Sequence, residues 1–182
     1  SFWPTINNTV AGLFHIFNVL ARQNSDYTSF DPQDYDGVLK APGCMIMGVT
    51  AVKDFESDTG IATSLKANLE TTLLAEGFNL QTAKGAAGIV VGGAKIFEET
   101  AGLMDNIEHA FSTLAALTGN AMVHRGIYED PEKEKLVVYT LIGGMDRPQS
   151  RLEELTKFLK LKNPRVENTV GQHFEDYGSS LT

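Results

Sequence analysis

The stretch Ser29-Phe30-Asp31-Pro32-Gln33-Asp34-Tyr35-Asp36 divides the chain into two different patterns. An apolar helical pattern precedes it, and an alternation of strands and helices follows it. Asp31 and Asp34 lie three positions apart at the start of a predicted short helix, residues 32–40. The simplest interpretation is a helix cap, with Asp31 as the N-cap residue and Asp34 in the first turn. The functional alternative is that both carboxylates project from the helix start and orient a water or hold a cation.

Upstream of this stretch, apolar residues recur at helical spacing and predict a helix over residues 4–22. They are Ile6, Val10, Leu13, Phe14, Phe17, Leu20 and Ala21. The apolar stripe is wide, because Ile16 and Val19 extend it beyond one face. A helix of this kind usually lies between two layers. Either another chain covers its second side, or the sequence is cut from a longer protein.

Downstream, the pattern predicts an α+β fold, a four-stranded mixed sheet packed with helices. The expected strands are residues 44–52, 85–91, 121–128 and 136–142, and the expected helices are residues 61–76, 97–117 and 149–161. The last two strands are joined by a charged turn, which favours an antiparallel hairpin. The strand at 136–142 is apolar on both faces and is expected at the centre of the sheet. Residues 163–182 are expected to form a mobile tail.

Composition excludes several classes of protein. The chain has 182 residues, 42% of them hydrophobic, and a net charge of -8. This acidic balance argues against direct binding to nucleic acid or to anionic membrane. Cys44 is the single cysteine, which excludes an internal disulfide and favours a reducing compartment. No apolar run reaches the roughly 18 residues of a membrane span, and no signal peptide is recognisable. We therefore expect a cytoplasmic protein.

Other groups that could carry chemistry are weak candidates. The four histidines, His15, His109, His124 and His173, show no metal-ligand spacing. We expect structural or surface roles for them, and no metal site. Gly92-Gly93 follows a strand and precedes a helix, but no phosphate-loop pattern is present. A tight strand-to-helix turn is the preferred interpretation there.

Five segments resemble, in order, motifs of the FtsZ/tubulin superfamily. They are Asn7-Asn8 near the start of a long helix, residues 29–34 as an Asn-x-Asp-x-x-Asp loop, residues 45–49 as a Met-Gly strand, residues 83–93 as the next strand, and residues 125–131 with 136–143 as a late hairpin. The resemblance covers residues 7–144 and is closer to the prokaryotic FtsZ-like branch than to eukaryotic tubulin. Ser29 stands where the loop motif has Asn.

The resemblance implies an organisation and a mechanism. Residues 1–28 would be the central linking helix and loop, residues 29–145 the C-terminal activation domain, and residues 146–182 a C-terminal helix and tail. Family members polymerise head to tail, and the acidic loop of one subunit positions the water in the GTP site of the next. Asp31 and Asp34 would be the catalytic residues, and Asn8 would contact the guanine base. GTP is the implied cofactor, with Mg²⁺ as a candidate companion ion.

The chain also departs from the family. The glycine-rich signature loop and the strands of the guanine pocket are absent from the sequence, so this fragment alone is not expected to bind or hydrolyse GTP. The implied partners are the missing GTPase domain and further copies of the same protein, which self-associate into filaments. The resemblance leaves open whether the role is cell division, shape control or DNA segregation.

Two other hypotheses remain at this stage. One is a stand-alone, non-catalytic interaction module that dimerises through its exposed N-terminal helix. The other is a small-molecule enzyme that uses Asp31 and Asp34 as general acid and base, which predicts a closed apolar pocket beside them.

Overall fold

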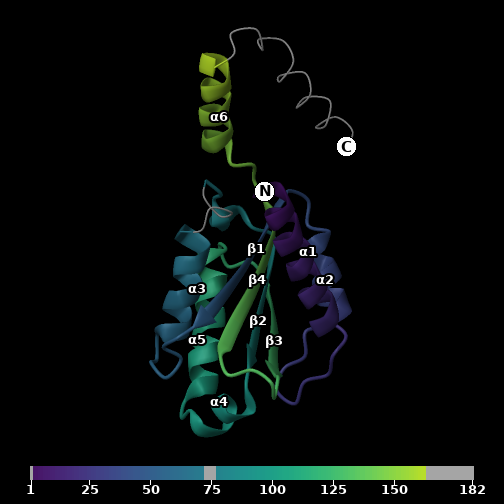
Figure 1. Ribbon diagram of the computed structural model, residues 1–182, viewed down its shortest axis with the longest axis vertical. Helices are drawn as coiled ribbons and strands as arrows, with labels where there is room; N and C mark the ends of the chain where they lie inside the picture. Colours follow the sequence, from purple (N-terminus) through teal and green to yellow (C-terminus); the bar gives the residue numbers. More distant parts are fainter. Residues whose placement is uncertain (1, 72–76, 163–182) are drawn as a thin grey trace. The chain divides into compact units, whose positions relative to one another are not determined.

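The computed structural model describes residues 2–71 and 77–162, and the chain divides into two compact units, Ser1–Arg147 and Pro148–Thr182. In the first unit the elements are α1 (Phe2–Leu20), α2 (Pro32–Leu39), β1 (Cys44–Val52), α3 (Gly60–Thr71), the 3-10 helix η1 (Leu80–Thr82), β2 (Gly85–Gly92), α4 (Ala94–Glu99), α5 (Leu103–Leu117), β3 (Val123–Glu129) and β4 (Leu136–Met145), as Figure 1 shows. The second unit contributes α6 (Gln149–Lys162).

The four strands form one mixed sheet in the order β1-β4-β2-β3. Strand β4 runs antiparallel to both β1 and β2, whereas β2 and β3 are parallel. The predicted α+β class with a four-stranded mixed sheet is therefore confirmed. The expected central position of β4 is also confirmed, since all its residues are buried except the half-buried Val137. A strand that is buried on both faces has a nearly continuous apolar sequence, and β4 has such a sequence.

The predicted hairpin between the last two strands is wrong. Strand β3 pairs with β2, and β4 lies on the other side of β2. The reason is the burial of β2, because all eight of its residues are buried and it takes a partner on each side. Strand β3 is partly exposed, which suits the edge of the sheet. The connection from β3 to β4 consequently crosses the end of β2, where the Asp130 amide donates to the Gly92 carbonyl over 2.9 Å.

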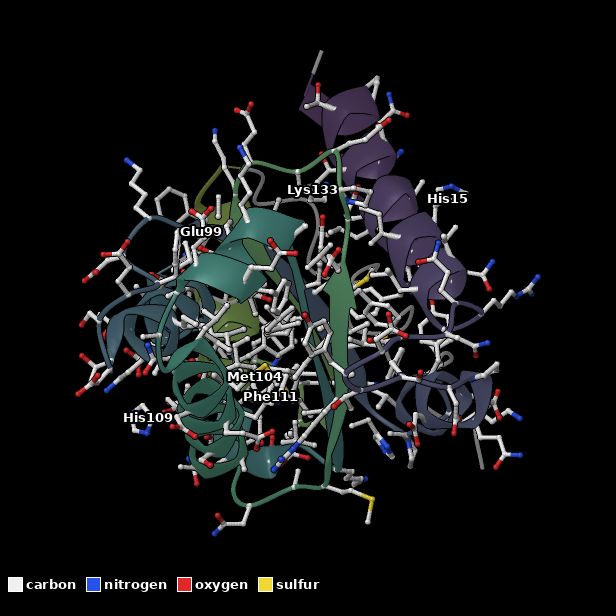
Figure 2. All side chains as sticks on the ribbon, turned by 90° about the horizontal axis from the view of Figure 1, so that it is seen from below. His15, Glu99, Met104, His109, Phe111 and Lys133 are labelled. Carbon is white, nitrogen blue, oxygen red and sulfur yellow. The ribbon has the colours of Figure 1, made fainter. Side chains whose placement is uncertain are left out.

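Helices cover both faces of the sheet (Figure 1). Side chains alternate between the two faces of each strand, so Val90 and Val138 pack with α3 and α5, whereas Ile89 and Tyr139 pack with α1 and α2. In Figure 2, which looks along the sheet from below, α1 and α2 lie on one side and α3 to α5 on the other. The sheet thus separates two hydrophobic cores.

Two helix predictions need correction. The single long helix expected at residues 97–117 is two helices, α4 and α5, because the chain turns at Gly102 with a φ of +73°. The N-terminal helix is present as α1, but its description as a long apolar helix is not supported. Of the α1 side chains that the structure describes, only Leu13, Phe17 and Leu20 are buried, and Val19 is 38% exposed.

Other predicted elements agree with the structure where it describes them. Helix α3 begins at Gly60, and the predicted continuation through Leu73 and Leu74 lies outside the described residues. Helix α6 matches the predicted helix at 149–161 and exposes Leu155, Phe158 and Leu159. The tail expected at residues 163–182 lies outside the described residues. Among the residues with a described position, none of the helices has the length and apolar character that a bilayer span requires.

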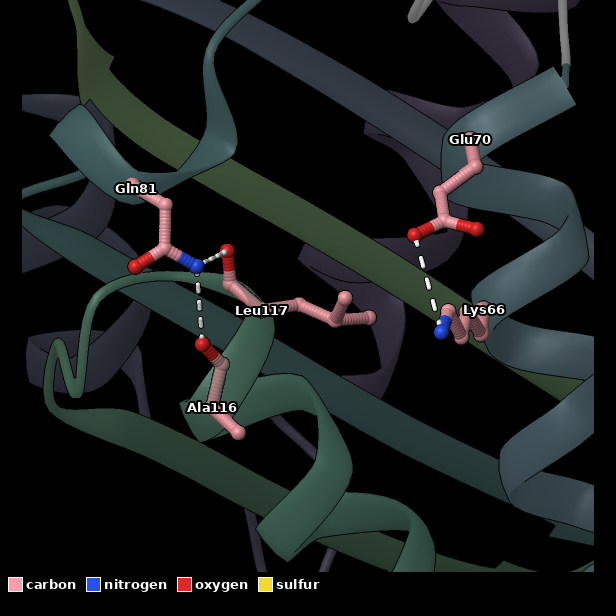
Figure 3. Close-up of polar contacts among 5 residues, drawn as sticks. All are labelled: Lys66, Glu70, Gln81, Ala116 and Leu117. Carbon is pink, nitrogen blue, oxygen red and sulfur yellow. Dashed lines mark hydrogen bonds and ion pairs between the residues drawn. The ribbon is translucent and has the colours of Figure 1, made fainter.

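A side chain distant in sequence satisfies the end of α5. The last carbonyl groups of a helix have no partner within it. Here the Gln81 side-chain nitrogen donates to the carbonyls of Ala116 and Leu117 over 3.0 and 2.9 Å, as Figure 3 shows. The Lys66–Glu70 pair in the same figure is exposed on α3 and contributes little to stability. The η1 segment is therefore fixed against the end of α5.

Gly93 follows β2 at the point where the β3–β4 connection crosses. A Cβ atom at Gly93 would lie 2.0 Å from the Lys133 carbonyl oxygen. The preferred interpretation of Gly92-Gly93, a tight turn between strand and helix, is confirmed, since β2 ends at Gly92 and α4 begins at Ala94. The structure adds the reason for the second glycine, which is the close approach of the crossing backbone.

We expect Gly93→Ala to lower the free energy of unfolding by about 1–3 kcal/mol, because the crossing backbone must move away from the new methyl group. Urea denaturation measures the loss. Gly37→Ala is the matched control, since no atom lies within 4 Å of a Cβ built at Gly37 in α2. The control should be neutral or slightly stabilising, and equal effects of the two substitutions would contradict the steric explanation.

Candidate functional site

The candidate site is the acidic turn, which we define as residues 29–34 at the start of α2. The chain reaches it along the outer edge of β3. There Thr28 forms a bridge with Ile127, whose amide donates to the Thr28 carbonyl over 2.8 Å. The Ser25 hydroxyl donates to the Ile127 carbonyl. The turn is therefore supported by a strand rather than suspended as a free loop.

Phe30 anchors the acidic turn in the hydrophobic core. It is fully buried, although its neighbours Ser29 and Asp31 are not. Its ring contacts Phe17 of α1 edge-on, with centroids 6.3 Å apart, and lies 6.1 Å from the ring of Tyr35. Phe17 also stacks on Tyr35 at 6.0 Å. Aromatic pairs in these geometries add to the stabilisation from burial, so α1, the turn and α2 pack as one group.

A buried hydroxyl links the turn to the end of α1 and to β3. The Tyr128 hydroxyl accepts a hydrogen bond from the Phe30 amide over 2.8 Å and donates to the Leu20 carbonyl over 2.9 Å. Tyr128 is 3% exposed. Burial raises its pKa, the Phe30 hydrogen bond lowers the pKa in part, and the charge of Asp31 raises it further. The neutral hydroxyl is thus the form that the folded protein requires.

Asp31 is the N-cap residue of α2, as predicted. Its backbone is extended, at φ -95° and ψ 165°. Its Oδ1 atom accepts hydrogen bonds from the amides of Gln33 and Asp34 over 2.7 and 2.9 Å. Pro32, which has no amide to satisfy, occupies the first helical position. The side chain stays exposed, so the cap leaves the carboxylate accessible to solvent.

Asp34 contacts a residue that the sequence did not connect to it. Its Oδ1 atom lies 2.8 Å from Nδ1 of His124 on β3, and the two side chains are 30% and 21% exposed. We expected only a structural or surface role for His124, since no spacing in the sequence connects it to the turn. The feature that could have predicted this contact is the sheet register. His124 lies on the same face of β3 as Tyr128 and thus faces α2.

The two acids have the same arrangement. Each uses Oδ1 for a contact within the fold, and neither Oδ2 atom has a hydrogen-bond partner in residues 2–71 and 77–162. These free oxygens can accept hydrogen bonds from a water molecule or ligate a cation. Within the described residues no three His, Cys, Asp or Glu side chains cluster as a metal site. Mg²⁺ bound by one or two carboxylates takes its other ligands from water and phosphate, so the turn fits part of such a site.

The remaining site predictions lie elsewhere. Asn8 is exposed on α1, nine residues before Phe17, whose ring contacts Phe30 of the turn, and nine residues span about 14 Å along the axis. The structure therefore does not bring Asn8 together with the acidic turn. Ser29 Oγ accepts a hydrogen bond from the Ser25 amide over 2.9 Å, so this hydroxyl stabilises the loop.

The best-formed hollows lined by residues 2–71 and 77–162 do not lie beside the acids, where a small-molecule enzyme would need its pocket. The hollows described on the molecule are lined by other residues. One lies between α1 and the β3–β4 connection, where His15, Gln23 and Lys133 border it. Others border α3 and α5 or lie on α6. An exposed, rigid turn is instead the geometry expected when the second half of a site is on another molecule.

One known protein family matches most of the chain. The sequence model of the family described as "Tubulin/FtsZ-like protein TubZ-like, C-terminal domain" matches residues 17–156. No curated protein is similar enough to this chain to be matched.

Solved structures share the fold. A type III plasmid segregation TubZ is 22% identical with a TM-score of 0.68, over 88% of this chain and 42% of its own. A GTPγS-form TubZ protofilament of Bacillus thuringiensis serovar israelensis is 19% identical with a TM-score of 0.68, over 92% and 42%. CetZ2 from Haloferax volcanii, a GTPγS-bound protofilament, is 15% identical with a TM-score of 0.62, over 87% and 46%. The chain thus spans less than half the length of these proteins.

We expect Tyr128→Phe to lower the free energy of unfolding by about 1–3 kcal/mol, because the Phe30 amide and the Leu20 carbonyl lose a buried partner. Urea denaturation measures the change. Tyr139→Phe is the matched control, since Tyr139 is 7% exposed and its hydroxyl has no hydrogen bond in the described residues. A similar loss in both variants would show that the hydroxyl of Tyr128 has no special role.

Stability should also depend on alkaline pH through Tyr128 and Tyr35. Burial is the largest cause that raises the pKa of each above the ordinary value of 10.0. Since the folded-state pKa is the higher one, the stabilisation is complete below the unfolded-state pKa and is lost as pH rises through the folded-state pKa. Denaturation above pH 10 should show a falling free energy of unfolding, with a smaller fall in Tyr128→Phe. Equal slopes would contradict this assignment.

Proposed function

The chain belongs to the TubZ-like C-terminal domain family of tubulin/FtsZ-like proteins, and from this premise we propose that it is the activation part of a GTPase that polymerises head to tail. The acidic turn completes the GTP hydrolysis site of the neighbouring subunit. The observation that carries the proposal is the turn itself, which presents two carboxylates with free Oδ2 atoms on a support fixed by Phe30 and Tyr128.

Solved relatives support the assembly. Structures of TubZ from Bacillus thuringiensis serovar israelensis include protofilaments in GDP and GTPγS forms, and TubZ-Bt is described in two-stranded and four-stranded filaments. By analogy, this chain acts with further copies of itself and with a nucleotide-binding domain, and GTP lies between subunits. One relative is named for plasmid segregation, and among the roles left open this is the one that a relative's name supports.

Asp31 and Asp34 orient the attacking water in this proposal. Phosphoryl transfer requires positioning and electrostatic stabilisation more than covalent chemistry from the protein. A water held by the free Oδ2 atoms is oriented for attack, and the rigid turn fixes its direction. When bound, Mg²⁺ would neutralise phosphate charge beside the same carboxylates.

The position of Asn8 fits the same arrangement. Asn8 offers an amide donor and a carbonyl acceptor to a guanine edge, and it is exposed near the start of α1, whereas the acidic turn packs against Phe17, nine residues further along that helix. A head-to-tail filament requires two such separated surfaces on one subunit. We propose residues 1–28 as the linking helix and loop, 29–145 as the activation domain, and 146–182 as a C-terminal extension.

The exposed side of α1 has a role in this assembly. Val19 is 38% exposed, and nothing lies within 4 Å of a Cβ built at Gly12. We assign this side of the helix to contact with the GTPase domain, which would account for the wide apolar stripe in the sequence. A stand-alone dimerising module remains the alternative, and it predicts that the acidic turn has no effect on nucleotide turnover.

Substitutions of Asp31 can separate capping from catalysis. In the complete gene product we expect Asp31→Asn to keep its stability, because Asn is as good an N-cap as Asp, and to hydrolyse GTP at least about 10-fold more slowly. Asp34→Ala should bind GTP normally and also hydrolyse it slowly. Phosphate release during assembly measures turnover. Wild-type turnover in both variants would refute the proposed function.

A further inference from the structure

The edge strand β3 holds the acidic turn at two points. The Tyr128 hydroxyl accepts a hydrogen bond from the amide of Phe30, one residue before Asp31, and Nδ1 of His124 lies 2.8 Å from Oδ1 of Asp34 itself. The two β3 residues lie four positions apart on one face of the strand, which separates them by about 13 Å. Tyr128 thus holds the backbone of the turn, whereas His124 reaches the side chain of Asp34.

We infer that His124 is a positioning residue, which orients the Asp34 carboxylate for the neighbouring subunit's GTP site. This inference rests on the proposed function. Nδ1 of His124 lies 2.8 Å from Asp34 Oδ1, and at this distance an Nδ1–H group would donate to the carboxylate and hold its plane. The direction of Asp34 Oδ2 is then fixed as well, and this atom has no partner among the described residues.

The surroundings of the pair favour this role over a purely structural one. A contact that served stability alone would be expected deeper in the core, but these side chains are only partly buried, with 21% and 30% of their surface exposed. The backbone of the turn is already fixed without His124, by the Asp31 cap and by Tyr128. The remaining freedom that His124 can restrict is rotation of the Asp34 side chain.

The local sequence around His124 supports the geometry. His124 pairs in register with Ala87 of β2, a small residue on the same face. Arg125, the next residue along, faces the other side of the sheet, where its guanidinium lies 5.5 Å from the Phe111 ring centre and bonds to Glu108. The guanidinium of Arg125 thus contacts groups on the other face, and among the described β3 side chains the imidazole of His124 is the one that reaches Asp34.

Two substitutions distinguish orientation from packing. Asn keeps a nitrogen donor attached at Cγ, where the imidazole has Nδ1, whereas Leu fills similar space without a donor. In the complete gene product we expect His124→Leu to lower the rate of GTP hydrolysis about 10-fold, as misplaced reacting groups do. GTP binding and the concentration needed for assembly should not change. His124→Asn should retain most of the rate.

A double substitution tests whether His124 acts through Asp34. His124→Leu should cause no further loss in an Asp34→Ala background, because the residue it positions is gone. An equal loss in both backgrounds would overturn the inference, as would equal rates for His124→Leu and His124→Asn. If instead Asp34→Ala hydrolyses GTP normally, the inference fails, and the proposed function fails as well only if Asp31→Asn also hydrolyses GTP normally.

A spectroscopic measurement keeps the contact itself testable. The measurement is NMR of the ring nitrogens in ¹⁵N-histidine-labelled gene product, below the concentration of assembly and at pH 8.5. A neutral imidazole that donates from Nδ1 gives the chemical shifts of the Nδ1–H tautomer. We expect these shifts for His124 in the wild type and their loss in Asp34→Ala. The Nε2–H tautomer in the wild type would overturn the inference whatever the hydrolysis rates.

Discussion

The buried hydroxyl of Tyr128 is the contact on which the arrangement of the site depends. It joins the end of α1, the acidic turn and β3 through the Leu20 carbonyl and the Phe30 amide. Leu20 and Phe30 lie 108 and 98 residues from Tyr128 in the sequence, and burial makes an unpaired group at this point costly. The rest of the site follows from this junction, because Phe30 enters the core beside it and Asp31 begins α2 directly after it.

The acidic turn reconciles two interpretations of the same residues. Asp31 is a helix cap, and this does not compete with a role toward another molecule, because the cap uses one carboxylate oxygen. Asp34 likewise gives one oxygen to His124. The folded chain thus orients both acids through contacts that leave an oxygen available. Rigid support of this kind is what precise positioning of a small reactant requires.

The sequence predicted what local patterns determine. Helix α2 with its Asp31 cap, the strands and the central place of β4 all follow from periodicity, capping and an unbroken apolar run. The pairing of β3 with β2 was missed, because a short charged connection is the usual mark of a hairpin and the burial of β2 is a non-local property. His124 was missed for the same reason, since only the sheet register brings it to Asp34. The break at Gly102 was missed because apolar spacing continues across it.

The bridge between Thr28 and Ile127 also bears on aggregation. An open strand edge is a template for pairing with other chains, and here the segment before the acidic turn shields the outer edge of β3. This backbone contact therefore limits pairing of β3 with other chains, and the proposed functional residues follow it directly in the chain. A chain without this segment would leave the outer edge of β3 open to pairing with other chains.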